Sequence, residues 1–269
     1  MIKPNRNLST IFSFLVNRIN LLKYGIATLH RTRICIFCQA ETIDSKRICP
    51  GCLLDLRWNT HHCPICAEPS ATDSNEVCGQ CQSTRPPYDK IVAPLIYGFP
   101  IDICIQRFKY SGQRRYAAPF CELFSRSLSK PEKIEKIEQA QINKMRFRDS
   151  DHPQCMIAVP MTPSKRRQRH YNQSELLCQH LAKRFNIRYQ NDIIIKSRDT
   201  APQAGLKKTE RIKNLKNSFA YVATNTPKHV AIIDDVVTTG ATAHTIALLL
   251  KEHGVERVDV WALARTAKS

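Results

Sequence analysis

The sequence has no long apolar run. A membrane-spanning helix needs about 20 mostly apolar residues, and no uncharged stretch of this chain approaches that length. The apolar run at residues 11–16 is too short for a secretory signal, and no cleavage site follows it. We therefore expect a cytoplasmic protein without a membrane span.

Acidic residues are also scarce. The chain has 23 Asp and Glu against 41 Lys and Arg, which gives a formal net charge of +18. Such an excess favours polyanionic partners: nucleic acid, phosphorylated small molecules or an anionic membrane surface. Charge alone does not choose among them, and any single lysine fits an ordinary solvated surface equally well.

The composition changes along the chain in a way that indicates three parts. With 269 residues, the chain is long enough for a full α/β core and a smaller appendage. Apolar strand and helix patterns begin after Pro86 and Pro87. We predict an amphipathic helix within residues 1–30, a small cysteine-rich zinc-binding domain over 31–86 and a larger domain over 87–269.

The first part has the pattern of an amphipathic helix. Its apolar residues recur every three or four positions over residues 8–29, while Arg18 and Lys23 lie off that face. The helix could dock on the protein's own surface or on a partner, or make peripheral contact with an anionic membrane. The sequence does not decide among these.

The second part is defined by cysteine pairs. The chain has 12 cysteines, and in a reducing cytosol clustered cysteines are metal ligands before they are disulfides. Eight of them form four Cys-x-x-Cys pairs, separated by 10, 10 and 11 residues: Cys35/Cys38, Cys49/Cys52, Cys63/Cys66 and Cys78/Cys81.

These pairs predict zinc. Zn²⁺ takes four thiolates in a tetrahedron, so eight paired cysteines suit two closed, structural sites. A redox function expects a single Cys-x-x-Cys within a βαβ unit, which four tandem pairs do not fit. Spacing does not tell whether the pairs combine in sequence or crosswise. His61 or His62 could replace a thiolate, although an adjacent His pair is more often an exposed loop.

The C-terminal part carries a candidate phosphate site. Residues 230–233 are typical of a buried strand, and residues 242–253 of a helix capped by Thr242 and ended by Gly254. The loop between them brings free backbone N–H groups to a helix N-terminus, where phosphate binds. The candidate ligand-binding residues are Asp234 and Asp235 for ribose hydroxyls, and Thr238, Thr239, Gly240, Ala241 and Thr242 for a phosphate.

This order of apolar strand, two acids, two apolar residues, Thr-Thr-Gly-x-Thr and helix resembles the phosphoribosyl pyrophosphate signature of the type I phosphoribosyltransferases. An acidic turn before an ordinary capped helix is the simpler alternative. Residue types, spacing and context together favour the signature over it.

Upstream segments complete an α/β pattern. Strands are expected over residues 91–97 and 156–160, helices over 101–110 and 172–185, and an exposed helix or insert over 130–151. The loop after Pro160 is basic and suits a pyrophosphate, although taken alone it would more often be a solvated turn. Its basic residues are Lys165, Arg166, Arg167, Arg169 and His170.

Taken together, these segments resemble the ComF family of competence-associated, phosphoribosyltransferase-like proteins, also called GntX-like. The resemblance implies an α/β fold in which a type I phosphoribosyltransferase-like parallel sheet with flanking helices follows the zinc-binding domain. Where the family usually reads Arg-Gly-Phe-Asn-Gln, His170 and Tyr171 depart from the pattern. Besides the cysteine pairs and residues 234–242, the resemblance rests on Phe108-Lys109-Tyr110-Ser111-Gly112, Val159-Pro160, Arg169-His170-Tyr171-Asn172-Gln173, Gln203, Arg211 and Asn214.

The resemblance also implies a ligand and a chemistry. Phosphoribosyl pyrophosphate (PRPP) would bind with Mg²⁺, its 5′-phosphate held by residues 238–242, its ribose hydroxyls by Asp234 and Asp235, and its pyrophosphate by Arg169. A nucleophile would attack C1 of the ribose, while the protein positions the reactants and neutralises charge. Purine-salvage relatives usually have an aspartate where this chain has Thr238, so a purine acceptor is disfavoured and no general base can be named.

Members of the ComF family are linked to natural transformation, the uptake and processing of single-stranded DNA. The alternative to a phosphoribosyltransferase is therefore a non-catalytic, zinc-containing adaptor that binds single-stranded DNA and competence proteins. Positive charge and aromatic residues beside basic ones, as in Phe108-Lys109-Tyr110, would serve phosphate neutralisation and base stacking. The sequence leaves both functions open.

Overall fold

The computed structural model describes residues 33–42, 47–70, 72, 74–128, 152–197 and 218–268. The predicted N-terminal helix, the segment 130–151 and the family residues Gln203, Arg211 and Asn214 lie outside these residues. The chain divides after Pro50 into two compact units. The predicted division into residues 1–30, 31–86 and 87–269 stays a prediction.

The described part of the first unit is a small antiparallel turn. Its strands are β1 (Arg33–Ile34) and β2 (Glu41–Thr42). The N–H of Cys35 donates to the carbonyl of Ala40 at 2.8 Å. The short helix α2 (Pro50–Leu54) begins where the two units divide.

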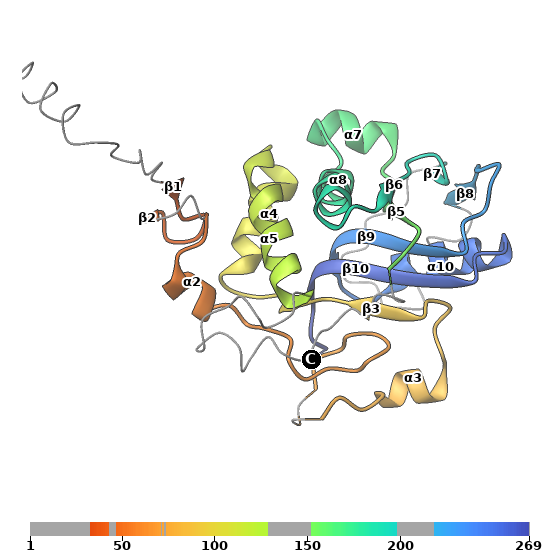
Figure 1. Cartoon of the computed structure of the whole chain (residues 1–269), viewed down its shortest axis with the longest axis horizontal. Coiled ribbons are helices and arrows are strands. Elements are labelled where there is room, and N and C mark those ends of the chain that lie inside the picture. The colour runs from red at the N-terminus through yellow and green to blue at the C-terminus, as the bar shows by residue number, and fades with distance from the viewer. Residues whose placement is uncertain are drawn as a thin grey trace, which may run out of the picture. The chain divides into compact units, whose positions relative to one another are not determined.

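A parallel sheet forms the centre of the second unit (Figure 1). Its strand order is β3-β10-β9-β5-β6, with β4 also paired to β10, and all these pairings are parallel. The expected parallel sheet with flanking helices is therefore confirmed. The strands are β3 (Lys90–Val92), β4 (Leu95–Ile96), β5 (Cys155–Ala158), β6 (Arg188–Tyr189), β9 (His229–Val237) and β10 (Arg257–Arg265).

The connections that leave β5 and β9, which are neighbours in the sheet, run in opposite directions. From β5 the chain passes through α7 (Pro163–Arg169) and α8 (Gln173–Phe185) to β6, and from β9 through α10 (Ala241–Glu252) to β10. Ligands of open parallel sheets bind outside the carboxyl ends of the strands at such a switch point. The loops that follow β5 and β9 begin there.

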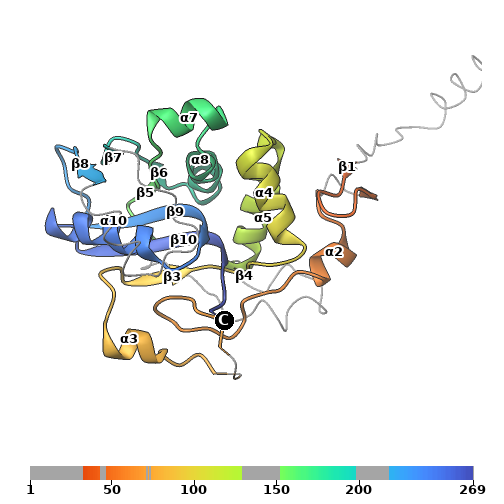
Figure 2. The ribbon, with the colours of Figure 1, turned by 180° about the vertical axis from the view of Figure 1, so that it is seen from behind.

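Helices cover both faces of the sheet (Figures 1 and 2). On one face, the ring of Trp261 in β10 stacks on Phe124 of α5 (Ala117–Leu128), with centroids 5.3 Å apart. The neighbouring Val260 belongs to a buried core that includes Leu250 of α10. Since successive strand residues point to opposite faces, α5 and α10 lie on opposite faces.

The remaining elements are shorter. Helix α4 (Ile101–Tyr110) coincides with the helix predicted over those residues, and it leads into the 3₁₀ turn η1 (Arg114–Tyr116). Strands β7 (Ile194–Lys196) and β8 (Phe219–Tyr221) form an antiparallel pair beside α10. None of the described helices is both long and apolar enough to cross a membrane.

The second cysteine-rich segment packs against the sheet. Cys63, Cys66 and Ala67 share one buried core with Ile91 of β3. The N–H of Ile91 donates to the carbonyl of Ile65 at 2.7 Å, which joins the backbone of this segment to the strand. The short helix α3 (Gly79–Ser83) carries Cys81 and ends the segment.

Candidate functional site

The eight paired cysteines form two tetrads, combined in sequence rather than crosswise. In each tetrad all four sulfur atoms lie within 4.8 Å of one another. Among the described residues, neither His61 nor His62 belongs to either tetrad. The first tetrad is Cys35, Cys38, Cys49 and Cys52, and the second is Cys63, Cys66, Cys78 and Cys81.

The two tetrads use the same backbone turn. Gln39 and Ala67, each directly after the second cysteine of a pair, have left-handed backbones with φ of 63° and 53°. The Sγ atom that opens each tetrad accepts a hydrogen bond at 3.4 Å: Cys35 from the N–H of Cys49, and Cys63 from the N–H of Cys78. This repetition indicates two copies of one metal-binding knuckle.

The sulfur positions fit zinc. A tetrahedral ZnS₄ centre with bonds of about 2.3 Å has S···S edges of about 3.8 Å. The Sγ atoms of Cys38 and Cys49 are 3.7 Å apart, and those of Cys66 and Cys78 are 3.6 Å apart. Two structural zinc ions are therefore consistent with both tetrads.

Backbone hydrogen bonds favour a thiolate at the start of each tetrad. Burial raises the pKa of Cys35, but N–H donors led by Cys49 outweigh it and lower the pKa to about 7. The pKa of Cys63 is lowered to about 7 in the same way, with Cys78 as the main donor. Burial instead raises the pKa of Cys66 to about 11, so zinc binding there releases a proton.

The candidate phosphate loop differs from the expectation at both ends. Strand β9 continues through Val237, so Asp234 and Asp235 are strand residues and the loop is only residues 238–240. Helix α10 begins at Ala241, and its N-cap is Gly240, not Thr242. Gly240 has a left-handed backbone with φ of 76°, which a threonine would adopt only with strain.

The loop nevertheless presents backbone donors. No side chain caps α10 among the described residues, and the N–H of Ala241 has only a long contact, 3.4 Å, with Oγ1 of Thr239. Gly240 and Ala241 are buried, Thr239 and Thr242 are half-buried and Thr238 is exposed. These residues lie outside the carboxyl end of β9, where a phosphate would find the free N–H groups of the helix.

The two acids make different contacts. Oδ1 of Asp234 accepts a hydrogen bond from Oγ of Ser174 at 3.1 Å, whereas Oδ1 of Asp235 lies 2.9 Å from the ammonium group of Lys109. Oδ2 of Asp235 is buried and has no hydrogen-bond partner within the part of the chain that the structure describes. A buried acceptor of this kind calls for a donor or a cation.

Burial and mutual repulsion shift the charges of this cluster. Burial, followed by the negative charge of Asp235, raises the pKa of Asp234 to about 7, although Lys109 and Ser174 favour the charged form. Burial also opposes the charge on Lys109, but Asp235 and Asp234 outweigh it, so the pKa of Lys109 is raised. Asp234 therefore gives up its proton less readily than an exposed aspartate, and a cation at the pair would favour its charged form.

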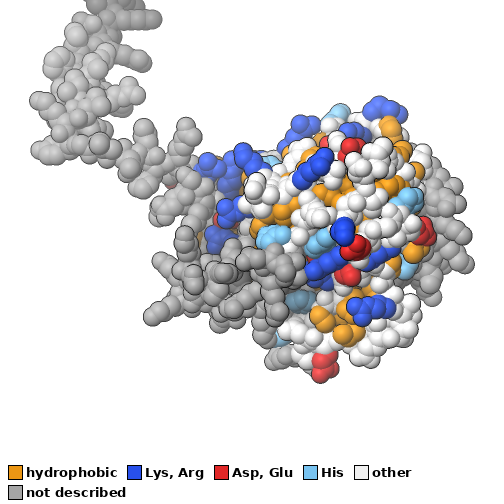
Figure 3. Space-filling view, turned by 45° about the vertical axis from the view of Figure 1, so that its right-hand side comes forward, with side chains coloured by type: hydrophobic (Ala, Val, Ile, Leu, Met, Phe, Trp, Pro, Cys, Tyr) orange, Lys and Arg blue, Asp and Glu red, His pale blue; other side chains and the backbone are white. Residues whose placement is uncertain are grey.

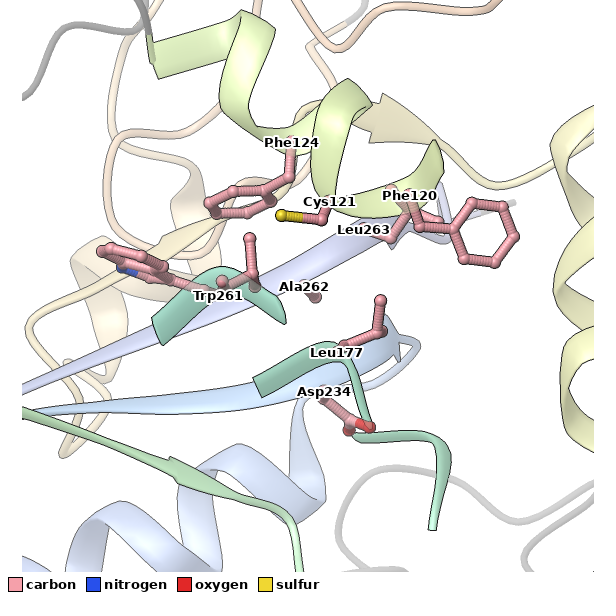
Figure 4. A pocket seen from close by; sticks show the side chains of 9 residues that line it. Phe120, Cys121, Phe124, Leu177, Asp234, Trp261, Ala262 and Leu263 are labelled. Carbon is pink, nitrogen blue, oxygen red and sulfur yellow. The ribbon is translucent and has the colours of Figure 1, made fainter. Parts of the chain in front are cut away.

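A small cavity lies beside Asp234 (Figure 4). Its volume of about 10 Å³ has room for about one water molecule. Phe124 and Cys121 of α5 lie on one side of it, and Leu177 and Asp234 lie on the other. This apolar lining explains why the Asp234 carboxyl group is poorly solvated.

The basic loop after β5 is partly helical. Its residues 163–169 form α7, so the prediction of a loop over residues 165–169 is wrong. Pro163 begins this helix, a position at which its fixed φ and missing N–H are favourable. Arg169 is the last residue of α7, and its guanidinium lies 4.7 Å from the ring centroid of Tyr110, which is exposed.

The basic loop is joined to the end of α4. The hydroxyl of Tyr171 donates to the carbonyl of Phe108, and their rings are 5.7 Å apart. Arg114 donates to the carbonyl of His170 at 3.1 Å. These contacts bring together two motifs that are about 60 residues apart in sequence and hold Lys109 at the acidic pair.

Asn172 closes the loop at its other end. Its Oδ1 accepts a hydrogen bond from the N–H of Ser174 at 3.0 Å and caps α8. Its Nδ2 donates to the carbonyl of Val159 at 2.9 Å, directly after β5. One side chain therefore fixes both the strand end and the helix start.

Residues 29–82 match the family model of the double zinc ribbon domain. The chain is 33% identical over 219 residues to the DNA utilization protein YhgH of Escherichia coli O157:H7, which covers 81% of this chain and 90% of that protein. It is 30% identical over 235 residues to competence protein F of Haemophilus influenzae, covering 86% and 96%. The chain belongs to the ComF family. Competence protein ComFC of Bacillus subtilis is 25% identical over 221 residues, covering 78% and 80%.

The backbone at His170 is one that glycine favours. His170 has φ of 65° and ψ of −8°, a left-handed conformation that glycine adopts freely. A glycine at this position could therefore adopt the same backbone as His170.

Sequence reasoning did not place Lys109 or Ser174 at the acidic pair. Lys109 was considered only for phosphate neutralisation in DNA binding and Ser174 was given no role, yet they are the partners of Asp235 and Asp234. Lys109 is part of Phe108-Lys109-Tyr110-Ser111-Gly112, so the signal was a lysine at the end of a helix within a family motif. Ser174 sits in the first turn of α8 and has no distinguishing pattern.

Proposed function

We propose that this ComF protein binds PRPP with Mg²⁺ at the carboxyl ends of β5 and β9 and acts in DNA uptake in the cytoplasm. The observation that carries the proposal is the buried Oδ2 of Asp235, which has no hydrogen-bond partner among the described residues and lies in the strand that leads to the Gly240 loop. The names of the relatives, DNA utilization protein and competence protein, support the DNA role.

Each part of PRPP has a counterpart in the site. Backbone N–H groups of residues 240–242 suit the 5′-phosphate. Asp234 and Asp235 suit the ribose hydroxyls, since each carboxylate oxygen accepts hydrogen bonds. Arg169 and Lys109 are the cations of the site, and they offset the pyrophosphate charge.

The acidic pair also fits Mg²⁺. Mg²⁺ binds carboxylate and phosphate oxygens and keeps part of its water shell, so two neighbouring acids beside a phosphate loop are a suitable donor set. When bound, Mg²⁺ would supply charge neutralisation of the pyrophosphate group. The residues of the chain would hold the ribose in a single orientation relative to the attacking nucleophile.

Binding is tested by calorimetric titration of PRPP with Mg²⁺. Asp234→Ala combined with Asp235→Ala should weaken binding at least about tenfold, because hydrogen bonds to charged groups contribute roughly 1.5–3 kcal/mol each. Glu252→Ala is the matched control, since it removes an exposed acid from the other end of α10. Equal affinities of the double variant and the wild type would refute the site, as would a wild type that does not bind.

Phosphoribosyl transfer, if catalysed, needs an acceptor. Thr238 is exposed and carries no carboxyl group, so the purine-salvage route of base activation is disfavoured. Release of pyrophosphate in the presence of nucleobases or single-stranded DNA would identify a transferase. PRPP binding without any pyrophosphate release would favour a sensory site in an adaptor.

A second candidate function is binding of single-stranded DNA and competence proteins. Arg169 lies over the exposed ring of Tyr110, and α7 exposes Arg167 and half-exposes Lys165. Basic side chains are more prominent than acidic ones on the face in Figure 3 and adjoin hydrophobic ones. Such a surface suits phosphate neutralisation and base stacking.

The DNA function is tested through salt dependence. Affinity for a single-stranded oligonucleotide should fall steeply with salt, and Lys165→Gln with Arg167→Gln should reduce the slope of log K against log salt by about 1–2. Lys228→Gln is the control, because Lys228 is exposed and precedes β9 at the opposite end of the strand. Binding that does not depend on salt would exclude this surface.

A further inference from the structure

Arg265, the last residue of β10, is a buried cation between the second zinc tetrad and the phosphate loop. Its Nε donates to the carbonyl of Cys66 at 3.1 Å, and one terminal nitrogen lies 2.6 Å from Oε2 of Glu68. The other terminal nitrogen donates to the carbonyl of Val237 at 3.0 Å and to that of Thr238. One guanidinium thus holds a zinc ligand on one side and the start of the loop on the other.

A second contact runs beside the first. Tyr88 is 4% exposed and belongs to the same buried core as Cys66 and Cys81. A Cβ atom added to Gly240 would lie 3.6 Å from the hydroxyl oxygen of Tyr88. The hydroxyl of Tyr88 therefore lies next to the glycine at which the candidate phosphate loop leads into α10.

Zinc bears directly on this contact. Cys66 directly precedes Ala67, the left-handed residue of the knuckle, and zinc bound to the Cys66 thiolate would restrain the neighbouring backbone carbonyl of Cys66. Glu68 follows two residues later, and its other oxygen, Oε1, accepts a hydrogen bond from the N–H of Lys268 at 2.7 Å. Without metal, the backbone of residues 63–68 loses its cross-link, and Arg265 loses the fixed acceptors that aim it at the loop.

We propose that the second zinc site and the phosphate loop are thermodynamically coupled through Arg265, which acts as a positioning residue. Zinc in this tetrad orders residues 237–240 for the phosphate, and ligand binding in turn retains the zinc, since coupling between two sites is reciprocal. The ligand part rests on the proposed function. Three cysteines of the first tetrad, Cys35, Cys38 and Cys49, belong to the other unit. Loss of zinc from the first tetrad is therefore the control for loss of zinc from the second.

The first experiment compares PRPP affinity among variants of the full chain, with zinc content measured by elemental analysis. Cys81→Ser and Arg265→Lys should bind PRPP at least tenfold more weakly than the wild type. Cys38→Ser loses the other zinc ion and should bind within about twofold of the wild type. Equal binding by wild type, Cys81→Ser and Arg265→Lys would overturn the proposal.

Glu68→Gln covers the case in which Cys81→Ser does not fold. It keeps every zinc ligand and removes one charged acceptor of Arg265. It should retain two zinc ions and bind PRPP several-fold more weakly. Wild-type affinity in Glu68→Gln together with wild-type affinity in Arg265→Lys would also overturn the coupling.

The second experiment tests whether ligand binding at the loop retains zinc in the second tetrad. PRPP with Mg²⁺ should slow the release of one of the two zinc ions to a chromogenic chelator in the wild type and should leave that rate unchanged in Arg265→Lys. A merely structural arginine would change stability without removing this ligand effect.

The third experiment separates this inference from the proposed function. Amide hydrogen exchange of residues 237–242, measured without PRPP, should be faster in Cys81→Ser than in Cys38→Ser. If the wild type does not bind PRPP, the proposed function fails, yet this difference still supports the coupling. Equal exchange in the two variants refutes the coupling whatever the ligand is.

Discussion

The ammonium group of Lys109 lies 2.9 Å from Oδ1 of Asp235, with side-chain exposures of 22% and 3%. This pair joins the end of α4 to β9, and within the described ranges the second carboxylate oxygen of Asp235, Oδ2, has no hydrogen-bond partner. Lys109 therefore compensates part of the acidic charge before any ligand binds.

Lys109→Met should destabilise the fold by about 3 kcal/mol, because it leaves a buried carboxylate without its cation. The double variant with Asp235→Asn should lose less than the sum of the two single variants, since it removes both charges. Urea denaturation of all three gives the coupling energy. Strictly additive losses would show that the pair contributes nothing.

Asp234→Asn should stabilise the protein at neutral pH. Burial raises the pKa of Asp234 to about 7, so between about pH 4 and 7 the folded state binds a proton that the unfolded state has released. The contribution of Asp234 to stability thus falls as the pH rises through this window. We expect a gain of about 2 kcal/mol at pH 8 that shrinks toward pH 4.

Urea denaturation at several pH values measures this gain. Asp192→Asn is the control, since Asp192 is an exposed acid outside the buried acidic pair. The same gain for Asp234→Asn at pH 8 and pH 5 would contradict the expectation.

His170→Gly should raise stability by up to about 1 kcal/mol. A left-handed backbone costs a non-glycine residue about 1–2 kcal/mol, and the greater freedom of glycine in the unfolded chain offsets part of the gain. His170→Ala keeps the strain and should not be stabilised. Equal thermal stability of the two variants would show that φ of 65° at this position is not strained.

The purified protein should carry two zinc ions. Cys38→Ser and Cys81→Ser should each retain one, because their sulfur atoms belong to different tetrads. Removal of both ions should unfold the cysteine-rich segment, since zinc binding to thiolate sites contributes folding free energy on the order of 10 kcal/mol. A folded, metal-free protein would contradict this.

The sequence predicted those helices whose apolar spacing and capping residues match their packing in the structure. Helix α4 falls on residues 101–110, and α8 starts one residue after Asn172, whose side chain caps it. The two cysteine sites were also predicted, but only the structure shows that each tetrad combines pairs that are neighbours in sequence. For the two helices, local signals and final contacts point to the same structure.

Other features depend on contacts that no local pattern carries. Strand β9 extends to Val237 because it pairs with β10 as far as Arg265, which overrides the turn propensity of two acids. The predicted strand over 91–97 is interrupted between Val92 and Leu95, so that β3 and β4 pair separately with β10. Lys109 contacts Asp235, 126 positions away in sequence, and Arg265 contacts Val237, 28 positions away. Only the folded structure shows these contacts.

The two hydrogen bonds of the Asn172 side chain, to Val159 and to Ser174, join the end of β5 to the start of α8 independently of the intervening helix α7. Since this side chain secures both the end of β5 and the start of α8, the chain between them can change in length or composition without loosening either element. Under either proposed function, substitutions in this one segment would change the preference for an acceptor or a nucleic acid. The fold thus places a variable region next to the candidate phosphate loop.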